Sequence, residues 1–307
     1  MPGRERSVDV EVWSGGVNTW ECDEMGHLNV RFWVARSLEG LAGLAARMDM
    51  PRAFSAKGGA TLVVREQHIR FLREARAGAT LTMTGGVVEM GETEARLLFV
   101  IRYDSGEPAA TFQTLVAHVT AHDLRPFPWP DRIRAAAEGL KVEIPAFAAA
   151  RSIDLSPVDS QASLARAEAL GLTRLGRGVL QPQECDVFGR MRGETVIGRI
   201  SDVVGRMYPG SEAGGATRIG GAVVEYRILH LAWPRAGDHL EIRSAHLGCD
   251  TRTRTALHWL LDPVTGQPWA SALAVGVTFD LDTRKLMEIP PHAQAAFNAQ
   301  VIPGLGL

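Results

Sequence analysis

The stretch that decides the fold is Trp20-Glu21-Cys22-Asp23-Glu24-Met25-Gly26-His27-Leu28-Asn29. It lies between a strand-like segment, Val8 to Val17, and a segment, Asn29 to Met48, whose apolar residues recur with the period of a helix. Asp and Gly are typical of turns, and Asn is a residue type that caps helices. The sequence therefore predicts a strand, a tight turn and a long helix, in this order.

The same turn occurs again 163 residues later. Glu21-Cys22-Asp23 recurs as Glu184-Cys185-Asp186, and Gly26 matches Gly189. Further matches keep their order along the chain, which indicates an internal duplication. They are Arg36 with Arg199, Glu39 with Asp202, Gly58–Thr61 with Gly214–Thr217, Ala77-Gly78 with Ala236-Gly237, and Val119-Thr120 with Val277-Thr278.

Four strand candidates follow the helix in each copy, and short breaks that contain Gly separate them. Such breaks favour antiparallel pairing of successive strands. The second copy begins with a strand at about Arg174 to Pro182 and a helix at about Gly193 to Met207. The four later strands are Thr61–Leu72, Ala79–Met90, Glu92–Tyr103 and Ala110–Asp123 in the first copy, and Thr217–Leu231, Asp238–Gly248, Thr251–Leu261 and Trp269–Leu281 in the second.

This order of elements predicts an α+β fold in which an antiparallel sheet wraps around a central helix, twice in one chain. We expect residues 1–125 to form the first repeat and residues 172–307 the second. The Pro-rich and Ala-rich residues 126–171 then form a connection that contains one or two helices. Pairing the two sheets edge to edge would hide exposed strand edges.

The composition of the 307 residues excludes several classes of protein. Hydrophobic residues make up 46% and charged residues 22%, as in a globular domain with a sizeable core. The net charge of -2 gives no basic footprint for nucleic acid. No apolar run is long enough to span a membrane, and no secretory leader is visible. Three cysteines without CxxC spacing indicate reduced thiols, so we expect a cytoplasmic protein.

The turn resembles a known signature. Asp23, Gly26, His27 and Asn29 match the Asp-x-x-Gly-His-x-Asn pattern of hotdog-fold thioesterases of the 4-hydroxybenzoyl-CoA type. The strand pattern extends this resemblance over residues 8–125 and 174–285, and fused copies resemble double-hotdog and acyl-ACP thioesterase-like proteins. The resemblance implies hydrolysis of an acyl-CoA or acyl-carrier-protein thioester without a metal or other cofactor, by a chain that associates as a homodimer.

The chemistry expected of the turn agrees with this resemblance. A carboxylate beside the amino end of a helix, here Asp23, has the chemistry to attack a thioester carbonyl or to activate water. Backbone N–H groups near Val30 would, by analogy with the family, hold the developing oxyanion. Gly26 lets the acyl chain approach closely. His27 either positions the reactants or packs at the helix start, and Asn29 either caps the helix or orients substrate.

Two further residues are candidates outside the turn. Glu39 and Arg36 lie three apart, so they share a helix face and are expected to form an ion pair. Glu39 is the alternative base, because some hotdog thioesterases use a helical carboxylate. His68, in the following strand, either lines the acyl pocket or lies in the core. His118 and His122 would share one face of a strand, but no carboxylate or Cys partner favours a metal site there.

The second copy departs from the signature. Arg190 stands where His27 stands, and Arg192 stands where Asn29 stands. An Arg beside Asp186 would keep that carboxylate paired, which is typical of a structural ion pair. We therefore expect one active site per chain. The alternative role for Arg190 and Arg192 is to bind a phosphate of the substrate carrier.

Two other functions stay open. A degenerate hotdog domain can bind or sense acyl-CoA without turnover. The intact signature in the first copy disfavours this function, and the loss of the signature in the second copy keeps it open. A hotdog enoyl-CoA hydratase is less favoured, because its signature places Asp and His five apart with an Asn between them. Here Asp23 and His27 are four apart, and no Asn lies between them.

Overall fold

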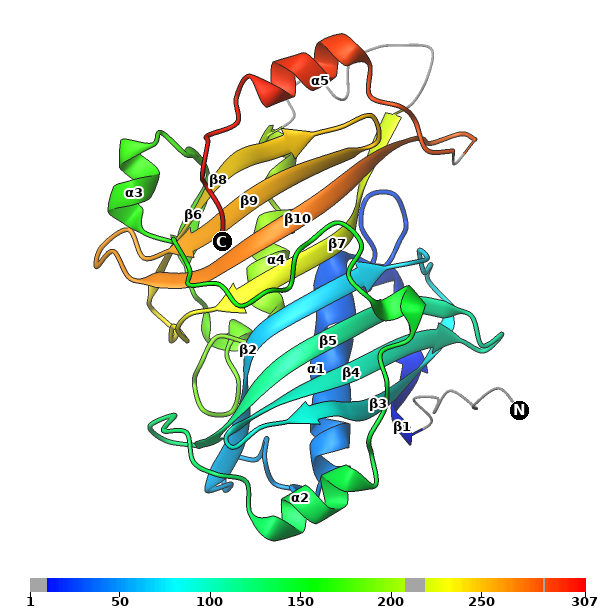
Figure 1. The fold of residues 1–307 in the computed structure, drawn as a ribbon, viewed down its shortest axis with the longest axis vertical. Helices are drawn as coiled ribbons and strands as arrows, with labels where there is room; N and C mark the ends of the chain where they lie inside the picture. The colour runs from blue at the N-terminus through cyan, green and yellow to red at the C-terminus, as the bar shows by residue number, and fades with distance from the viewer. Residues whose placement is uncertain (1–9, 208–218, 284) are drawn as a thin grey trace. The chain divides into compact units, whose positions relative to one another are not determined.

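The computed structural model describes residues 10–207, 219–283 and 285–307, which form two compact units. The first unit contains Met1–Ala149 and Asp186–Glu194, and the second contains Ala150–Cys185 and Thr195–Leu307. Each unit contains an antiparallel sheet with a helix along one face (Figure 1). The main boundary, after Ala149, falls inside the connection expected from the sequence.

In the first unit the strands follow one another in the order β1-β3-β4-β5-β2, and all neighbours are antiparallel. The central helix α1 follows the signature turn. The elements are β1 (Val10–Gly16), η1 (Thr19–Glu21), α1 (Val30–Arg47), β2 (Ala60–Phe71), β3 (Thr80–Met90), β4 (Glu94–Tyr103), β5 (Pro108–Thr120), α2 (Asp131–Glu138) and η2 (Ala146–Ala148).

The second unit repeats this order as β6-β8-β9-β10-β7. Equal strand orders in the two units agree with the internal duplication. The elements are α3 (Leu164–Ala169), β6 (Thr173–Val179), η3 (Pro182–Glu184), α4 (Glu194–Ser201), η4 (Val204–Met207), β7 (Ile219–His230), β8 (His239–Cys249), β9 (Thr253–Leu261), β10 (Pro268–Asp280) and α5 (Pro291–Asn298). The expected residues Thr217 and Arg218 of strand β7 lie outside the described residues, as do Val8 and Asp9 of strand β1.

One pairing expected from the sequence is wrong. Strands β2 and β3 do not pair, although a short Gly-containing segment joins them; β2 pairs with β5, and β3 pairs with β1. The joining segment passes the signature turn, where the amide of Leu28 donates to the carbonyl of Ala75 at 2.7 Å. The chain thereby crosses from β2, at one end of the strand order, to β3, which is second from the other end, and it supports the turn on its way.

The second central helix is also shorter than expected. The sequence predicts one helix over 193–207, whereas α4 ends at Ser201 and the short turn η4 follows. The amide of Val203 bonds to the carbonyl of Ile200, which tightens the chain into a turn of 3-10 type. The β-branched Val203 and Val204, followed by Gly205, disfavour continuation of the α-helix.

Helix α1 packs one face against strands β1 and β3. Its buried apolar residues include Trp33, Leu41 and Leu44. Gly40 and Gly43 lie where the strands approach most closely, because a Cβ atom there would collide with Met83 and with the carbonyl of Val12. Small residues on one stripe of the helix thus set its distance from the sheet.

Residues of the expected connection cover part of the first sheet. Leu98 and Val100 point to the same side of β4, where they form a cluster with Ala148. The side chain of Gln113 donates to the carbonyl of Ala148 at 2.8 Å. The chain up to Ala149 is therefore part of the first unit's core. No helix within 10–207, 219–283 and 285–307 has the length and apolarity to cross a membrane.

Candidate active site

The carboxylate of Asp23 closes the first signature turn. Its Oδ1 accepts hydrogen bonds from the amides of Met25, at 2.9 Å, and His27, at 3.0 Å. Gly26 has a φ of +78°, a conformation that other residues adopt only with strain. Among the described residues, none donates a hydrogen bond to the second oxygen, Oδ2. One oxygen is thus structural, and the other remains available for chemistry.

The start of α1 leaves one amide without a partner. Asn29 is the N-cap, as expected from its type, and its side chain accepts from the amide of Arg31 at 2.9 Å. The amides of Phe32 and Trp33 bond to the carbonyl of Asn29. The amide of Val30 has no acceptor in the part of the chain that the structure describes. This N–H is the donor expected from the family analogy.

His27 is buried beside an acidic residue that the sequence does not single out. Its side chain is 6% exposed, and its Nε2 lies 3.2 Å from the Oε2 of Glu74. Glu74 belongs to the crossing segment between β2 and β3. No motif marks it, because its position depends on the strand pairing that the sequence did not predict.

The second turn has the same backbone hydrogen bonds to its aspartate, but the second oxygen of this aspartate has a side-chain partner. The Oδ1 of Asp186 accepts from the amides of Phe188, at 2.8 Å, and Arg190, at 3.0 Å. Its Oδ2 lies 3.2 Å from both the Nε and an Nη of Arg190. The guanidinium is buried and lies over the ring of Phe188. The expected ion pair between Asp186 and Arg190 is confirmed.

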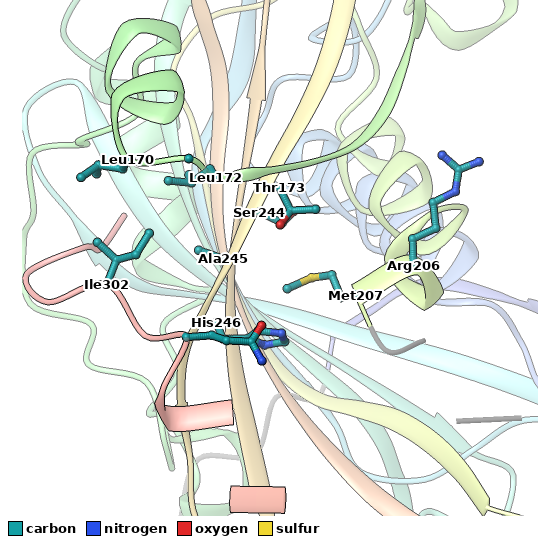
Figure 2. Close-up of a pocket in the computed structure, with 11 residues that line it drawn as sticks. Leu170, Leu172, Thr173, Arg206, Met207, Ser244, Ala245, His246 and Ile302 are labelled. Carbon is teal, nitrogen blue, oxygen red and sulfur yellow. The ribbon is translucent and has the colours of Figure 1, made fainter. Parts of the chain in front are cut away.

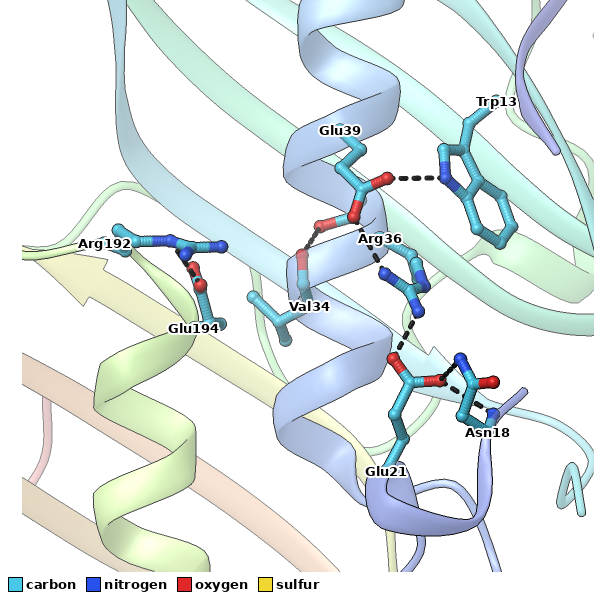
Figure 3. A network of polar contacts seen from close by, with 9 residues as sticks. Trp13, Asn18, Glu21, Val34, Arg36, Glu39, Arg192 and Glu194 are labelled. Carbon is cyan, nitrogen blue, oxygen red and sulfur yellow. Dashed lines mark hydrogen bonds and ion pairs between the residues drawn. The ribbon is translucent and has the colours of Figure 1, made fainter. Parts of the chain in front are cut away.

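Glu39 and Arg36 also form the expected ion pair, at 2.9 Å (Figure 3). The other carboxylate oxygen of Glu39 accepts from the indole N–H of Trp13 at 2.7 Å. Arg36 also forms an ion pair with the buried Glu21, a residue of the repeated turn. In the second unit Arg199 binds Glu184 through two nitrogens, at 3.0 and 2.6 Å, rather than Asp202.

Asp23 and Glu39 are separate candidates. The helical rise of about 1.5 Å per residue places Glu39 roughly 15 Å along the axis from Asn29, which adjoins the turn. The structure therefore groups Asp23, His27, Asn29 and Val30 at one end of α1 and leaves Glu39 apart from them.

Glu194 was missed by sequence reasoning. Its side chain is 4% exposed, and its Oε1 lies 2.6 Å from the Nε of Arg192. Burial raises the pKa of Glu194, with Glu39 adding to the shift and Arg192 and Arg31 opposing it. The signal in the sequence was a reversal of charge, because Glu194 stands in the second copy where Arg31 stands in the first.

The remaining histidine candidates lie in the core or in a turn. His68 is fully buried in β2. His118 stacks on Trp129, and burial lowers its pKa. His122 follows the end of β5 at Thr120, so the two histidines do not share a strand face as expected. The described residues contain no group of three or more His, Cys, Asp or Glu that could hold a metal ion.

The second unit contains a cavity of about 410 Å³ that none of the expected site residues lines (Figure 2). At its wall, Ser244 Oγ lies 2.8 Å from Nδ1 of His258. Both residues are buried, and burial lowers the pKa of His258 to about 3. The lining residues include Leu172, Thr173, Arg206, Ser244, His246 and Ile302.

Several solved structures share this fold. A Lactobacillus plantarum protein assigned as an oleoyl thioesterase matches with a TM-score of 0.66 and 11% identity, over 87% of this chain and 95% of that one. An acyl-ACP thioesterase from Bacteroides thetaiotaomicron VPI-5482 matches with a TM-score of 0.64 and 10% identity, over 86% and 96% of the chains. The 12:0-ACP thioesterase from Umbellularia californica matches with a TM-score of 0.63 and 12% identity, over 87% and 93%.

Such identities show the fold alone, and they confirm the expected α+β fold with tandem hotdog repeats. No curated protein is similar enough to the sequence to be matched. A family model does match both copies, over residues 17–137 and 180–297. Together with the duplicated turn and the repeated strand order, this match shows that the chain belongs to the thioesterase-like superfamily.

Proposed function

We propose that the protein hydrolyses an acyl thioester at the first signature turn, with Asp23 as the nucleophile or the general base. The contrast between the two turns carries this proposal. Both aspartates use Oδ1 to close the turn, but Arg190 holds Oδ2 of Asp186, whereas no described residue holds Oδ2 of Asp23. One copy keeps a reactive oxygen, and the other has lost it.

The partnerless amide of Val30 supplies the second requirement of the reaction. As the carbonyl carbon becomes tetrahedral, its oxygen gains negative charge, which an N–H at a helix start stabilises. Oδ2 of Asp23 then either attacks the carbonyl carbon directly or takes a proton from the attacking water. His27, paired with Glu74, fixes the turn that carries Asp23, and Gly26 leaves space beside that turn.

The substrate class we propose is an acyl group on CoA or on an acyl carrier protein. The similar structures include thioesterases named for oleoyl and for acyl-ACP substrates. Free cysteines agree with a cytoplasmic location, which we propose together with assembly as a homodimer. Gel filtration with light scattering tests the dimer independently of activity.

Thiol release from a panel of acyl-CoAs, short to long and aromatic, and from acyl carrier proteins tests the proposed reaction. We expect turnover on part of the panel and a fall of at least about 100-fold in kcat for Asp23→Asn, which keeps the Oδ1 acceptor. Unchanged turnover in Asp23→Asn would move the chemistry to another carboxylate. Tight binding without thiol release on every substrate would favour a sensor of acyl-CoA instead.

A further inference from the structure

The chain that follows α2 seals one edge of the first sheet. The amide of Val87 in β3 donates to the carbonyl of Leu140 at 2.9 Å, and the amide of Val142 donates to the carbonyl of Val87 at 3.0 Å. Gly86 makes this contact possible, because a Cβ atom there would lie only 2.5 Å from Cγ1 of Val142. The seal therefore depends on a residue of β3 that has no side chain.

The corresponding edge of the second unit has a side chain at this position. Strands β3 and β8 have the same length and the same order of neighbours, and Ala245 in β8 stands where Gly86 stands in β3. The two residues that correspond to the sealing pair are Gln300 and Ile302. In the part of the chain that the structure describes, no backbone hydrogen bond joins these two residues to β8. Together with Ala245 they line the cavity of about 410 Å³, so the second unit has a cavity where the first unit has a seal.

Contacts on both sides of the cavity fix the chain that follows α5. Asn298 binds the backbone of Cys249, since its Oδ1 accepts from the amide at 2.8 Å and its Nδ2 donates to the carbonyl at 2.9 Å. Further along, the main-chain oxygen of Leu307 accepts from the amide of Gln161 at 2.6 Å, and the side chain of Leu307 is buried in an apolar cluster. The wall of the cavity is therefore part of the folded unit.

A buried hydroxyl group lies at this cavity. Ser244 lines the cavity (Figure 2), and its Oγ lies 2.8 Å from Nδ1 of His258. Nε2 of His258 is buried and has no hydrogen-bond partner among the described residues. A buried N–H without an acceptor is the rarer arrangement, so the neutral ring carries its proton on Nδ1 and donates it to Ser244. The hydroxyl hydrogen of Ser244 then has no acceptor within the described chain.

The charges around the cavity favour a neutral ligand. Of the lining residues that the structure describes, Arg206 is the one that is charged at neutral pH, and its guanidinium donates to the carbonyl of Leu175 at 2.7 Å. This guanidinium points away from the other labelled side chains (Figure 2). Burial lowers the pKa of His246, and the charge of Arg254 adds to this shift. An ionised ligand would lose its hydration here without gaining a counter-charge, so the Ser244 hydroxyl suits a neutral acceptor.

We propose that this cavity binds a neutral, mostly apolar molecule through a carbonyl oxygen, as in a ketone, ester or amide, which accepts a hydrogen bond from Ser244. The apolar side chains of Leu172, Met207 and Ile302 contact the rest of the molecule. A volume of about 410 Å³ is within the range of ligand pockets, roughly 300–1,000 Å³. All lining residues belong to the second unit, so the site is separate from the first signature turn and does not depend on the proposed function.

Equilibrium dialysis of the whole protein against 2-acetonaphthone and 2-ethylnaphthalene tests the site. The two probes have nearly the same shape, and only the first carries a carbonyl oxygen. We expect the wild type to bind 2-acetonaphthone about tenfold more tightly, which is the effect of one hydrogen bond to a buried hydroxyl group. Ser244→Ala should make the two affinities equal. Equal affinities in the wild type, no binding of either probe, or a preference that persists in Ser244→Ala would overturn the proposal.

Ser271→Ala is the matched control, because Ser271 is as deeply buried in the same unit and does not line this cavity. It should keep the wild-type preference for the carbonyl probe. Loss of the preference in this variant as well would show that the effect of Ser244→Ala is not local, and would overturn the site.

Ala245→Gly tests the position of the site independently of the hydroxyl group. It removes the methyl group that keeps the chain after α5 away from β8, so this edge can close as it does beside Gly86. We expect both probes to bind at least about tenfold more weakly, because a closed cavity cannot bury them. Unchanged binding in Ala245→Gly would show that the probes bind elsewhere, and would overturn the site.

Discussion

The carboxylates of Asp23 and Asp186 hold identical turns and differ at their second oxygen. A residue four positions further on makes the difference, since His27 pairs with Glu74 and Arg190 pairs with Asp186 itself. A charge-assisted bond to a buried guanidinium holds a carboxylate in place. At the scale of single residues, and under the proposed function, this one difference in sequence separates a reactive carboxylate from a structural one.

Val30 offers a test of the oxyanion donor at the same scale. Proline is favoured at the first helical position, and Asn29, with φ -61° and ψ 143°, has the extended backbone that a following proline requires. Val30→Pro removes an N–H that bonds to no described residue. We therefore expect kcat for thiol release to fall by about 100-fold or more, with melting temperature nearly unchanged.

The matched control is Val30→Ala, which truncates the same side chain and keeps the amide. It should retain wild-type kcat to within a few-fold. Equal activity in Val30→Pro and the wild type would show that this amide does not bind the transition state.

The local residues of the site could be predicted from the sequence, and their distant partners could not. Residue type predicted the Asn29 cap, and sequence proximity predicted the Arg36–Glu39 and Asp186–Arg190 pairs, because each contact joins residues within one turn or helix face. Glu74 reaches His27 through the crossing of the chain between β2 and β3, and Glu194 lies in the first unit although it follows the second turn. Those contacts depend on tertiary structure, which local periodicity does not encode.

The positions of the secondary-structure elements could likewise be predicted from the sequence, but their pairing could not. Strand-like segments separated by glycine-containing breaks predicted each strand that the structure describes, but they did not reveal that β2 pairs with β5. Pairing is decided by which sheet face each strand buries and by the path of the connecting chain. The sequence of helix α1 also reflects packing against the sheet. Gly43 has low helix propensity, but its lack of a side chain lets β1 approach the helix.

Gly43→Ala distinguishes packing from propensity by the sign of its effect. In an exposed helix Ala is more stable than Gly by about 1 kcal/mol. Here the added methyl group would collide with the carbonyl of Val12, so we expect a loss of about 1–3 kcal/mol in the free energy of unfolding. Urea denaturation measures the change.

Gly59→Ala is the corresponding control, because a Cβ atom there meets nothing within 4 Å. Its free energy of unfolding should stay within about 0.5 kcal/mol of the wild type. A stabilised Gly43→Ala protein would show that α1 and β1 are not closely packed at this point.

At the scale of the whole molecule, buried histidines couple stability to pH. Burial lowers the pKa of His230 to about 4 and that of His258 to about 3. Unfolding restores both to about 6.5, so the unfolded chain binds more protons below that pH. Stability is therefore fully present above pH 6.5 and declines as pH falls toward the folded-state values.

Urea unfolding between pH 6.5 and 5 should reveal this decline. We expect each of the two histidines to contribute a loss of about 2 kcal/mol over that interval. His258→Gln should reduce the slope by about half. An unaltered slope in this variant would show that His258 is not buried in its neutral form.

Duplication has left two copies of one turn, and the central claim is that only the first performs thioester hydrolysis. Thiol release by Asp23→Asn and Asp186→Asn, compared on the substrate that the wild type prefers, tests this claim most directly. The two substitutions alter equivalent atoms of equivalent turns. We predict that kcat falls at least about 100-fold in Asp23→Asn and stays within about threefold in Asp186→Asn. Equal losses in both variants, or a loss in Asp186→Asn alone, would contradict the claim.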